Sequence, residues 1–153
     1  MTESLDTMER ESKQYIVVKI GSEQYGIDIS YIDNIVIMQN ITRVPSAQMY
    51  FKGIINLRGE IVPVMSIRLR MGLEDDEITS LSRIIILKIE EQGAVGIIVD
   101  EVKEVVRLSA NEIDRNVQDM KEEKSNFING IGKSNDQLIS LLEIGSIIEE
   151  EIL

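Results

Sequence analysis

The stretch that decides the fold is Tyr15-Ile16-Val17-Val18-Lys19-Ile20, followed after a short polar gap by Gly26-Ile27-Asp28-Ile29-Ser30-Tyr31-Ile32-Asp33-Asn34-Ile35-Val36. It recurs as Ile84-Ile85-Ile86-Leu87-Lys88-Ile89, followed by Gly96-Ile97-Ile98-Val99-Asp100-Glu101-Val102-Lys103-Glu104-Val105-Val106. Each copy begins with a nearly continuous apolar run, which is typical of a strand buried on both faces. The chain therefore contains a duplicated unit of strands rather than one central catalytic cleft.

A second block is duplicated downstream of the first. Phe51 and Phe127 each open it, and Gly53 and Gly130 lead at identical separation to Ile61-Val62-Pro63-Val64 and Leu138-Ile139-Ser140-Leu141. Identical spacing of glycines and apolar residues predicts the same strand order in both copies. We expect residues 15–65 to overlay residues 84–142 with matching connectivity.

Length and composition favour an all-β fold with short helices, made of two small barrels that share a core. The chain has 153 residues, of which 43% are hydrophobic and only 4% aromatic, as expected for an aliphatic, strand-rich interior. About 60 residues alone bury too little surface for comfortable stability. We therefore expect one domain at 13–153, behind a flexible tail at 1–12. One subdomain is expected at 13–66 plus a C-terminal helix at 144–153, and the other at 67–143.

Two stretches have helical spacing. Ile29, Ile32 and Ile35 predict one helical turn over 29–34, before a strand from 35 to 41. Ile144, Ile147, Ile148 and Ile152 form one apolar face of the expected C-terminal helix, and that face is assigned to the core.

Composition excludes several classes of function. The chain has no Cys and no His, so it lacks a thiolate metal site, a cysteine nucleophile and an imidazole base. Its net charge of −11 repels nucleic acid and anionic lipid, although the charge also keeps an aliphatic protein soluble. No signal peptide or membrane-spanning run is recognisable. We expect a cytoplasmic protein with no cofactor, no nucleic-acid partner and no direct membrane insertion.

Carboxylates are the remaining candidates for chemistry. Asp28, Asp33 and Asp100 lie among isoleucines and valines, where they either converge as a catalytic pair or cap turns at strand junctions. The acidic run at 74–77 lacks the alternating ligand spacing of a calcium loop and is interpreted as a solvated linker. A small carboxylate-dependent hydrolase is thus a remote alternative.

The two copies differ at one hairpin tip. The first reads Asn56-Leu57-Arg58-Gly59-Glu60, whereas the second reads Lys133-Ser134-Asn135-Asp136-Gln137, an ordinary polar turn. A tight glycine turn holds Arg58 where it can make charge-assisted, bidentate contacts, which favours a role in recognition. The alternative is a local pair with Glu60.

These residues resemble a known family. The stretch Phe51-Lys52-Gly53-Ile54-Ile55-Asn56-Leu57-Arg58-Gly59-Glu60-Ile61-Val62-Pro63-Val64 is similar to the signature of the CheW family, the bacterial chemotaxis coupling proteins. Tyr25-Gly26-Ile27-Asp28-Ile29, Thr42-Arg43-Val44-Pro45 and Val95-Gly96-Ile97-Ile98-Val99-Asp100-Glu101-Val102 resemble further family segments in the same order. The resemblance spans residues 13–152.

The resemblance implies two intertwined five-stranded SH3-like barrels. It also implies a non-catalytic adaptor that joins the regulatory domain of the histidine kinase CheA to the cytoplasmic tips of chemoreceptors. Such an adaptor is recruited to membrane receptor arrays through its partners. Ring-forming contacts with a second copy or with the kinase are left open. A receiver domain or a kinase core would need a longer chain, so the fusion protein CheV and the kinase itself are not expected.

The resemblance also implies two sets of binding residues, for all of which ordinary core packing is the alternative. The receptor helix would lie against an apolar groove between the subdomains, formed by Ile16, Ile29, Ile32, Ile35, Val99 and Val102, with Arg58 beside it. The kinase would bind the exposed end of the first barrel at Val36, Met38, Ile41 and Val44. Asn34 departs from the family pattern, because many relatives carry glutamate there.

The predicted function is therefore a scaffold that transmits receptor state to a kinase by binding both. The alternative within the same fold is a scaffold of a non-chemotactic receptor–kinase array.

Overall fold

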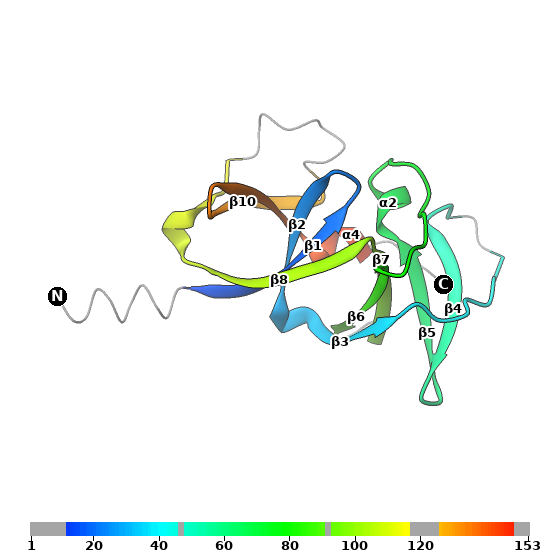
Figure 1. Ribbon diagram of the computed structural model, residues 1–153. Helices are drawn as coiled ribbons and strands as arrows, with labels where there is room; N and C mark the ends of the chain where they lie inside the picture. Colours follow the sequence, from blue (N-terminus) through cyan, green and yellow to red (C-terminus); the bar gives the residue numbers. More distant parts are fainter. Residues whose placement is uncertain (1–11, 46–47, 91–92, 117–125, 149–153) are drawn as a thin grey trace.

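The computed structural model describes residues 12–45, 48–90, 93–116 and 126–148, and most of them lie in strands of two sheets (Figure 1). The all-β fold class with short helices is confirmed. The tail expected at 1–12 lies outside the described residues except for Ser12.

The first copy of the repeat contributes five strands and the second contributes six, and each copy ends in a short helix; most of these elements are labelled in Figure 1. The elements of the first copy are β1 (Lys13–Ile20), β2 (Glu23–Asp28), the 3₁₀ turn η1 (Ile29–Tyr31), β3 (Ile32–Ile37), β4 (Phe51–Leu57), β5 (Glu60–Ser66) and α2 (Ile67–Arg70). Those of the second copy are β6 (Arg83–Ile89), β7 (Gly93–Val99), β8 (Glu101–Leu108), η2 (Ala110–Glu112), the two-residue β9 (Ile113–Asp114), β10 (Ile128–Ser134), β11 (Gln137–Leu142) and α4 (Ile144–Ile148).

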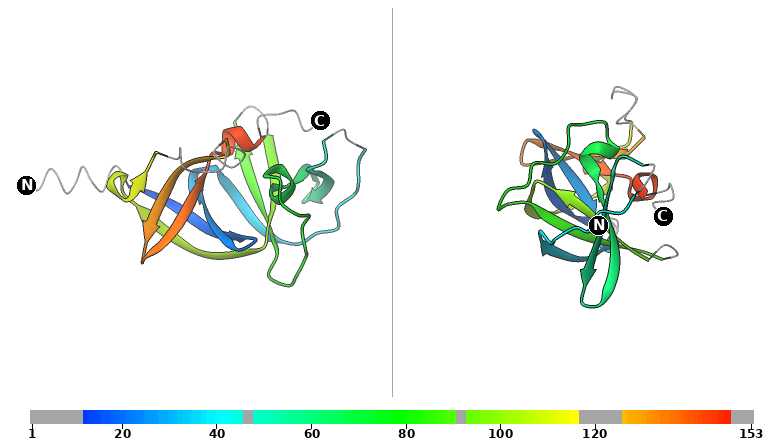
Figure 2. Two further views of the ribbon diagram at one scale, coloured as in Figure 1. Left: turned by 90° about the horizontal axis from the view of Figure 1, so that it is seen from above. Right: turned by 90° about the vertical axis from the view of Figure 1, so that its right-hand side faces the viewer.

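The two copies exchange strands. One sheet, barrel 1, has the order β8-β1-β2-β11-β10-β9, and the other, barrel 2, has the order β3-β6-β7-β5-β4. The first two strands of each copy therefore join the remaining strands of the other copy. Corresponding pairs run in the same sense, including the parallel pairs β11–β2 and β5–β7. The expected matching connectivity is confirmed, and Figure 2 shows the two barrels side by side.

The sheets do not follow the expected division into 13–66 and 67–143. Strands β1 and β2 belong to barrel 1 with β8 to β11, while strands β3 to β7 form barrel 2. The expected boundary at residue 66 is corrected for a physical reason: the edges of the β1–β2 hairpin bond to β8 and β11 rather than to strands of its own copy.

The exchange explains the continuous apolar runs. In β1, Tyr15 and Val17 face the interior of barrel 1, whereas Ile16 and Val18 face a third core between the barrels. In β6, Ile84 and Ile86 likewise face barrel 2 while alternate residues face the third core. Side chains alternate along a strand, so both strands are buried on both faces. We call the cluster between the barrels the shared core.

The C-terminal helix packs on this shared core. Ile144, Ile147 and Ile148 are buried in it, as the apolar stripe predicts. Arg70 of α2 donates from Nε to the carbonyl of Ile147 at 2.9 Å. The guanidinium also lies 4.7 Å from the Tyr50 ring centre and 5.0 Å from that of Phe127. The expected helical residues 149–153, including Ile152, lie outside the described part of the chain.

The helical turn expected over 29–34 is only partly correct. A 3₁₀ turn covers 29–31, and β3 then begins at Ile32 and ends at Ile37. The β3–β6 register shifts between Ile32 and Asn34, which marks a β-bulge at Asp33. A bulge inserts one residue into a strand, so Ile32 and Ile35 face the same side despite a spacing of three. The apolar spacing of this bulged strand is therefore the same as that of a helical turn.

Candidate docking surfaces

The six apolar residues expected to line a receptor groove do come together. Ile16 and Val99 are part of the shared core, and the remaining four pack against it while partly exposed: Ile29, Ile32, Ile35 and Val102. Val99 has no exposed surface, so it forms the floor of this region and cannot touch a partner directly. We call the six residues the shared face.

Arg58 does not belong to the shared core. It lies at the exposed tip of the β4–β5 hairpin, as expected, and its neighbour Leu57 packs on the core of barrel 2. Arg58 has φ of 54° and Gly59 has φ of 85°, the positive pair of a two-residue type I′ loop. Asn56 Oδ1 accepts a hydrogen bond from the Gly59 amide at 2.9 Å. No ion pair joins Arg58 to Glu60 in the described part of the chain, so the local-pair alternative gains no support.

The backbone at Arg58 is unfavourable for an arginine. Non-glycine residues in the left-handed region cost about 1–2 kcal/mol, and asparagine tolerates the region better. The second hairpin places Asn135 and Asp136 at the equivalent positions, with φ of 50° and 62°. Strained residues cluster at functional sites, and this strain motivates a recognition role for the Arg58 side chain.

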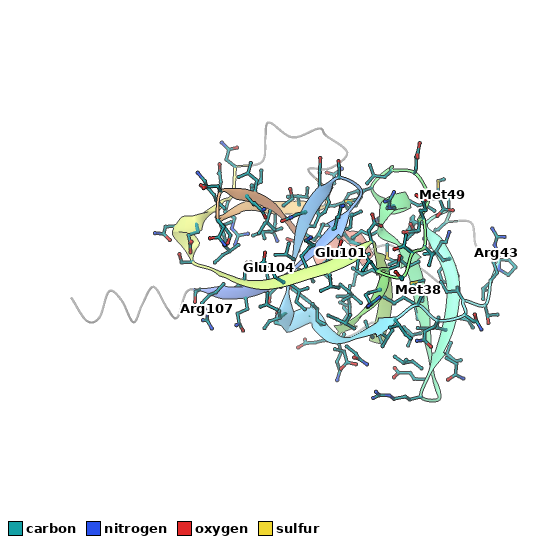
Figure 3. The ribbon with its side chains drawn as sticks, viewed as in Figure 1. Met38, Arg43, Met49, Glu101, Glu104 and Arg107 are labelled. Atoms are coloured by element: carbon teal, nitrogen blue, oxygen red, sulfur yellow. The ribbon has the colours of Figure 1, made fainter. Side chains whose placement is uncertain are left out.

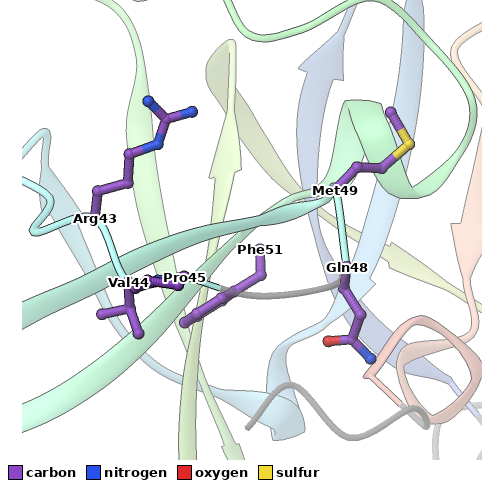
Figure 4. Close-up of a pocket in the computed structure, with 6 residues that line it drawn as sticks. All are labelled: Arg43, Val44, Pro45, Gln48, Met49 and Phe51. Carbon is purple, nitrogen blue, oxygen red and sulfur yellow. The ribbon is translucent and has the colours of Figure 1, made fainter.

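The residues expected to bind a kinase lie on barrel 2. Val36, Met38 and Ile41 are partly buried and pack against its core. Val44 does not pack there but lines an adjoining pocket of about 430 Å³ with Pro45 and Phe51 (Figure 4). Because Met38 and Ile41 support the barrel, a charge introduced at either position would reduce stability as well as any binding.

Met49 is more exposed than these four residues, and the sequence did not single it out as a contact. It lines both the pocket with Val44 and a neighbouring pocket of about 380 Å³ with Ile41. Its side chain is 75% exposed, and Figure 3 shows it on the same side of the molecule as Met38. Met49 lies two residues before Phe51 in the sequence, and this position next to β4 was the signal that could have identified it as a contact residue. We call Val36, Met38, Ile41, Val44 and Met49 the barrel-end face.

Two of the three carboxylates considered for catalysis make hydrogen bonds that hold the fold together. Asp28 caps η1 by accepting a hydrogen bond from the Ser30 amide at 2.9 Å. Asp100 accepts hydrogen bonds from Arg68 Nε at 3.0 Å and from the Gly21 amide at 2.8 Å. It thereby ties α2 and the β1–β2 turn to the point where the chain crosses between barrels. Asp33 is exposed.

Asp100 has the wrong acidity for a general acid. Burial acts to raise the pKa of its carboxyl group, but hydrogen bonds from Arg68 and Gly21 outweigh burial and hold the pKa below its usual value. Acid catalysis near neutral pH requires a raised pKa. The hydrolase alternative therefore finds no support at this residue.

Asp100→Asn should destabilise the protein at pH 7 by roughly 1.5–3 kcal/mol, the range for hydrogen bonds to charged groups. A lowered folded-state pKa gives stability that is present above the unfolded value near 3.8 and is lost as pH falls through the folded value. The difference between the variant and wild type should therefore shrink at pH 3. Urea unfolding at both pH values measures this, and an equal difference at the two would contradict the assignment.

The acidic run shows no metal-binding arrangement. Asp75 pairs with Lys52 at 2.8 Å, which together with the Asp76 amide holds the pKa of Asp75 below its usual value. Burial raises the pKa of Asp76. Within the described residues no group of three or more acidic side chains is placed to hold a metal ion.

Comparison with known proteins agrees with the resemblance seen in the sequence. A family model described as CheW-like domain matches residues 14–151. The chain belongs to the CheW family.

Relatives support this membership over nearly the full length. The chemotaxis protein CheW of Helicobacter pylori is 34% identical over 90% of this chain and 82% of its own. That of Bacillus subtilis is 31% identical over 99% of this chain and 94% of its own. The crystal structure of the scaffolding protein TtCheW from Thermoanaerobacter tengcongensis superposes with a TM-score of 0.82 at 33% identity, covering 92% of this chain and 95% of that one. The two SH3-like subdomains expected of a CheW-family chain are thereby confirmed, with β9 as a short sixth strand in barrel 1.

Among the described residues of this CheW-family chain, no helix is long and apolar enough to cross a membrane.

Proposed function

We propose that this protein is a non-catalytic chemotaxis adaptor that couples chemoreceptors to the histidine kinase CheA in the cytoplasm. The observation that carries the proposal is the presence of two separate, partly exposed apolar surfaces on one folded unit. The shared face lies between the barrels, and the barrel-end face lies on barrel 2. A bridge needs two surfaces that can be occupied together.

The shared face suits a receptor helix. Ile29, Ile32, Ile35 and Val102 are half-buried, so their positions are fixed by the core while part of each side chain remains accessible. An amphipathic helix that lays its apolar stripe on such a surface needs little rearrangement of the protein. Arg58 adds a cation on an exposed hairpin, where it can pair with a receptor carboxylate.

The barrel-end face suits the regulatory domain of the kinase. It combines half-buried aliphatic side chains with the exposed Met49, and methionine adapts to irregular partner surfaces. Burial of apolar area is not screened by ions. Binding of the kinase should therefore tolerate salt.

Coupling follows from linkage. A bridge changes kinase activity only if its contacts differ between receptor signalling states. The shared face sits where strands of both copies meet, so a receptor bound there contacts both barrels. Recruitment to receptor arrays then follows from binding and requires no membrane segment.

The test is assembly of a ternary complex. The purified protein is mixed with the CheA regulatory domain and with a chemoreceptor tip fragment, and sedimentation measures the species formed. A complex of all three supports the proposal, with Arg58→Asn weakening only the binding of the receptor fragment and Met49→Asp losing only the kinase domain. Competition of the two partners for one surface would contradict it.

Arg58→Asn should weaken receptor binding by about ten-fold or more while unfolding stability stays equal or rises by up to about 1 kcal/mol. Loss of a charge-assisted contact accounts for the first effect, and relief of the left-handed backbone for the second. Titration with the receptor fragment and urea unfolding measure the two.

The matched control is Asn135→Arg at the equivalent tip. It should lower stability by about 1 kcal/mol without affecting receptor binding. A clear loss of stability in Arg58→Asn would show instead that the arginine is structural.

A further inference from the structure

Asp100 fixes the segment at which the chain crosses from β7 of barrel 2 to β8 of barrel 1. Its backbone amide donates to the Lys19 carbonyl at 3.0 Å, and its carboxylate accepts from the Gly21 amide at 2.8 Å. The segment is therefore attached to the β1–β2 turn. Val99 and Val102 of the shared face lie on either side of Asp100 in the sequence, so this part of the shared face cannot move without Asp100.

The short helix α2 reaches the same carboxylate from barrel 2. Arg68 donates from Nε to one oxygen of Asp100 at 3.0 Å and from Nη2 to the other. The two side chains are 17% and 20% exposed, so solvent screens the pair only weakly. A bidentate arginine–carboxylate pair fixes orientation as well as distance. It therefore joins α2 rigidly to the crossing segment.

The other residues of α2 border the barrel-end face. Leu69 packs against the shared core and also lines the pocket of about 380 Å³ with Ile41 and Met49. The amide of Ser66, which caps the helix, donates to the carbonyl of Tyr50 at 2.7 Å, and Tyr50 follows Met49 in the chain. A helix of four residues thus touches the supports of both docking surfaces.

The duplication shows that this connection belongs to one crossing only. In the repeated sequence, Ser30 corresponds to Asp100 and Gly145 corresponds to Arg68. Gly145 has no side chain, and the Ser30 amide donates locally to Asp28. The crossing from β2 to β3 therefore cannot carry an equivalent ion pair. The pair is present in the copy whose helix borders Met49.

We propose that Arg68 and Asp100 are positioning residues that couple the two docking surfaces, with α2 as the connector between them. This deepens the proposed function and rests on it. A partner on the shared face holds the crossing segment, the ion pair holds α2 against that segment, and Leu69 holds the wall of the pocket beside Met49. The second partner then meets a surface that is already ordered, which lowers the cost of binding. Each partner should raise the affinity for the other by the same factor, because coupling is reciprocal.

The experiment titrates the intact protein with the CheA regulatory domain, with and without a saturating chemoreceptor tip fragment. Calorimetry gives the two dissociation constants, and their ratio is the coupling factor. In wild type we expect a factor of about five or more, at the lower end of typical couplings. In Arg68→Gln the factor should fall to about one, while the affinity for each partner alone stays within about two-fold of wild type, because Arg68 belongs to neither docking surface.

Further variants test whether the pair acts as a unit. Asp100→Asn should lose the coupling as Arg68→Gln does, and the double variant should lose no more than either single one, because both substitutions break the same connection. Arg68→Lys keeps the charge without the bidentate geometry, so its factor should lie between those of wild type and Arg68→Gln. This conservative variant decides the question if Arg68→Gln fails to fold.

Gly130→Ala is the matched control for stability. Its added Cβ meets Ile113 and Arg115 in barrel 1 rather than α2. It should lower the melting temperature and keep the coupling factor of wild type. If Gly130→Ala lost the coupling as Arg68→Gln does, the factor would follow stability alone and the inference would be overturned.

The inference and the proposed function fail differently. If a ternary complex forms but wild type shows a coupling factor of one, or if Arg68→Gln and Arg68→Lys both keep the wild-type factor, the inference is overturned and the adaptor function stands. If a folded Arg68→Gln loses a partner outright, Arg68 is a contact residue and the positioning role is overturned. If no ternary complex forms with wild type, both are overturned. Melting temperatures of all variants identify losses that come from unfolding.

Discussion

Replacing Gly53 with alanine is expected to lower the free energy of unfolding by about 3–5 kcal/mol, a loss of roughly 10 °C in melting temperature. Gly53 has φ of 141°, a region that side chains with a Cβ rarely adopt. An added Cβ would lie 2.2 Å from the carbonyl oxygen of Thr42. Thr42 and Ile54 exchange backbone hydrogen bonds of 2.8 and 2.9 Å that close barrel 2, and the substitution would force this closure apart.

Gly130→Ala is the matched control, because Gly130 holds the same position in the second copy. Its added Cβ would meet side-chain atoms, of which the nearest is Ile113 Cγ2 at 2.9 Å, and these can move. The cost should be about 1–2 kcal/mol. Thermal unfolding of both variants measures the difference. Equal losses would show that closure at Thr42 does not depend on the missing side chain.

Met49→Asp is expected to abolish binding of the CheA regulatory domain while leaving the melting temperature within about 2 °C of wild type. The side chain is 75% exposed, and surface substitutions usually change stability by about 0.5 kcal/mol or less. Docking would desolvate the new carboxylate without a partner, which weakens binding by orders of magnitude. Calorimetric titration at two ionic strengths measures affinity and its salt dependence.

Met38→Asp provides the contrast at the same face. Met38 is partly buried against the core of barrel 2, so this variant should lose stability as well as binding. A charge at Met38 or Ile41 therefore does not separate binding from folding, whereas a charge at Met49 does. Normal kinase binding by Met49→Asp, or affinity that falls steeply with salt, would place the kinase surface elsewhere. The acidic loop at Glu74 would then be tested next.

Much of the fold was predictable because the repeat is visible in the local spacing of glycines and apolar residues. Apolar runs at Tyr15 and Ile84 predicted strands buried on both faces, and the hairpin with Arg58-Gly59 at its tip was expected between two strands. The bulge at Asp33 was not predictable, since a bulged strand and a helical turn give the same apolar spacing at 29–35. Only the hydrogen bonds to β6 distinguish the two.

The sequence predicted which apolar side chains gather between the barrels but not which of them are exposed. The six residues of the shared face gather as expected, yet Val99 is fully buried while Val105, which was not expected, is 54% exposed. Both residues are valines in the same apolar segment of the sequence, so residue type does not distinguish them. Their exposure depends on which strands of the other copy pack over them, and this information is absent from the local pattern.

The sequence by itself determined that this protein is a duplicated set of strands with an aliphatic core and an arginine at one hairpin tip. Only the tertiary structure decided that each barrel takes the first two strands of one copy and the remaining strands of the other. The reason is physical: equivalent edges of β2 and β7 offer the same backbone hydrogen bonds to β11 or to β5. Local pairing preferences are therefore equal, and packing of the shared core selects the exchanged arrangement.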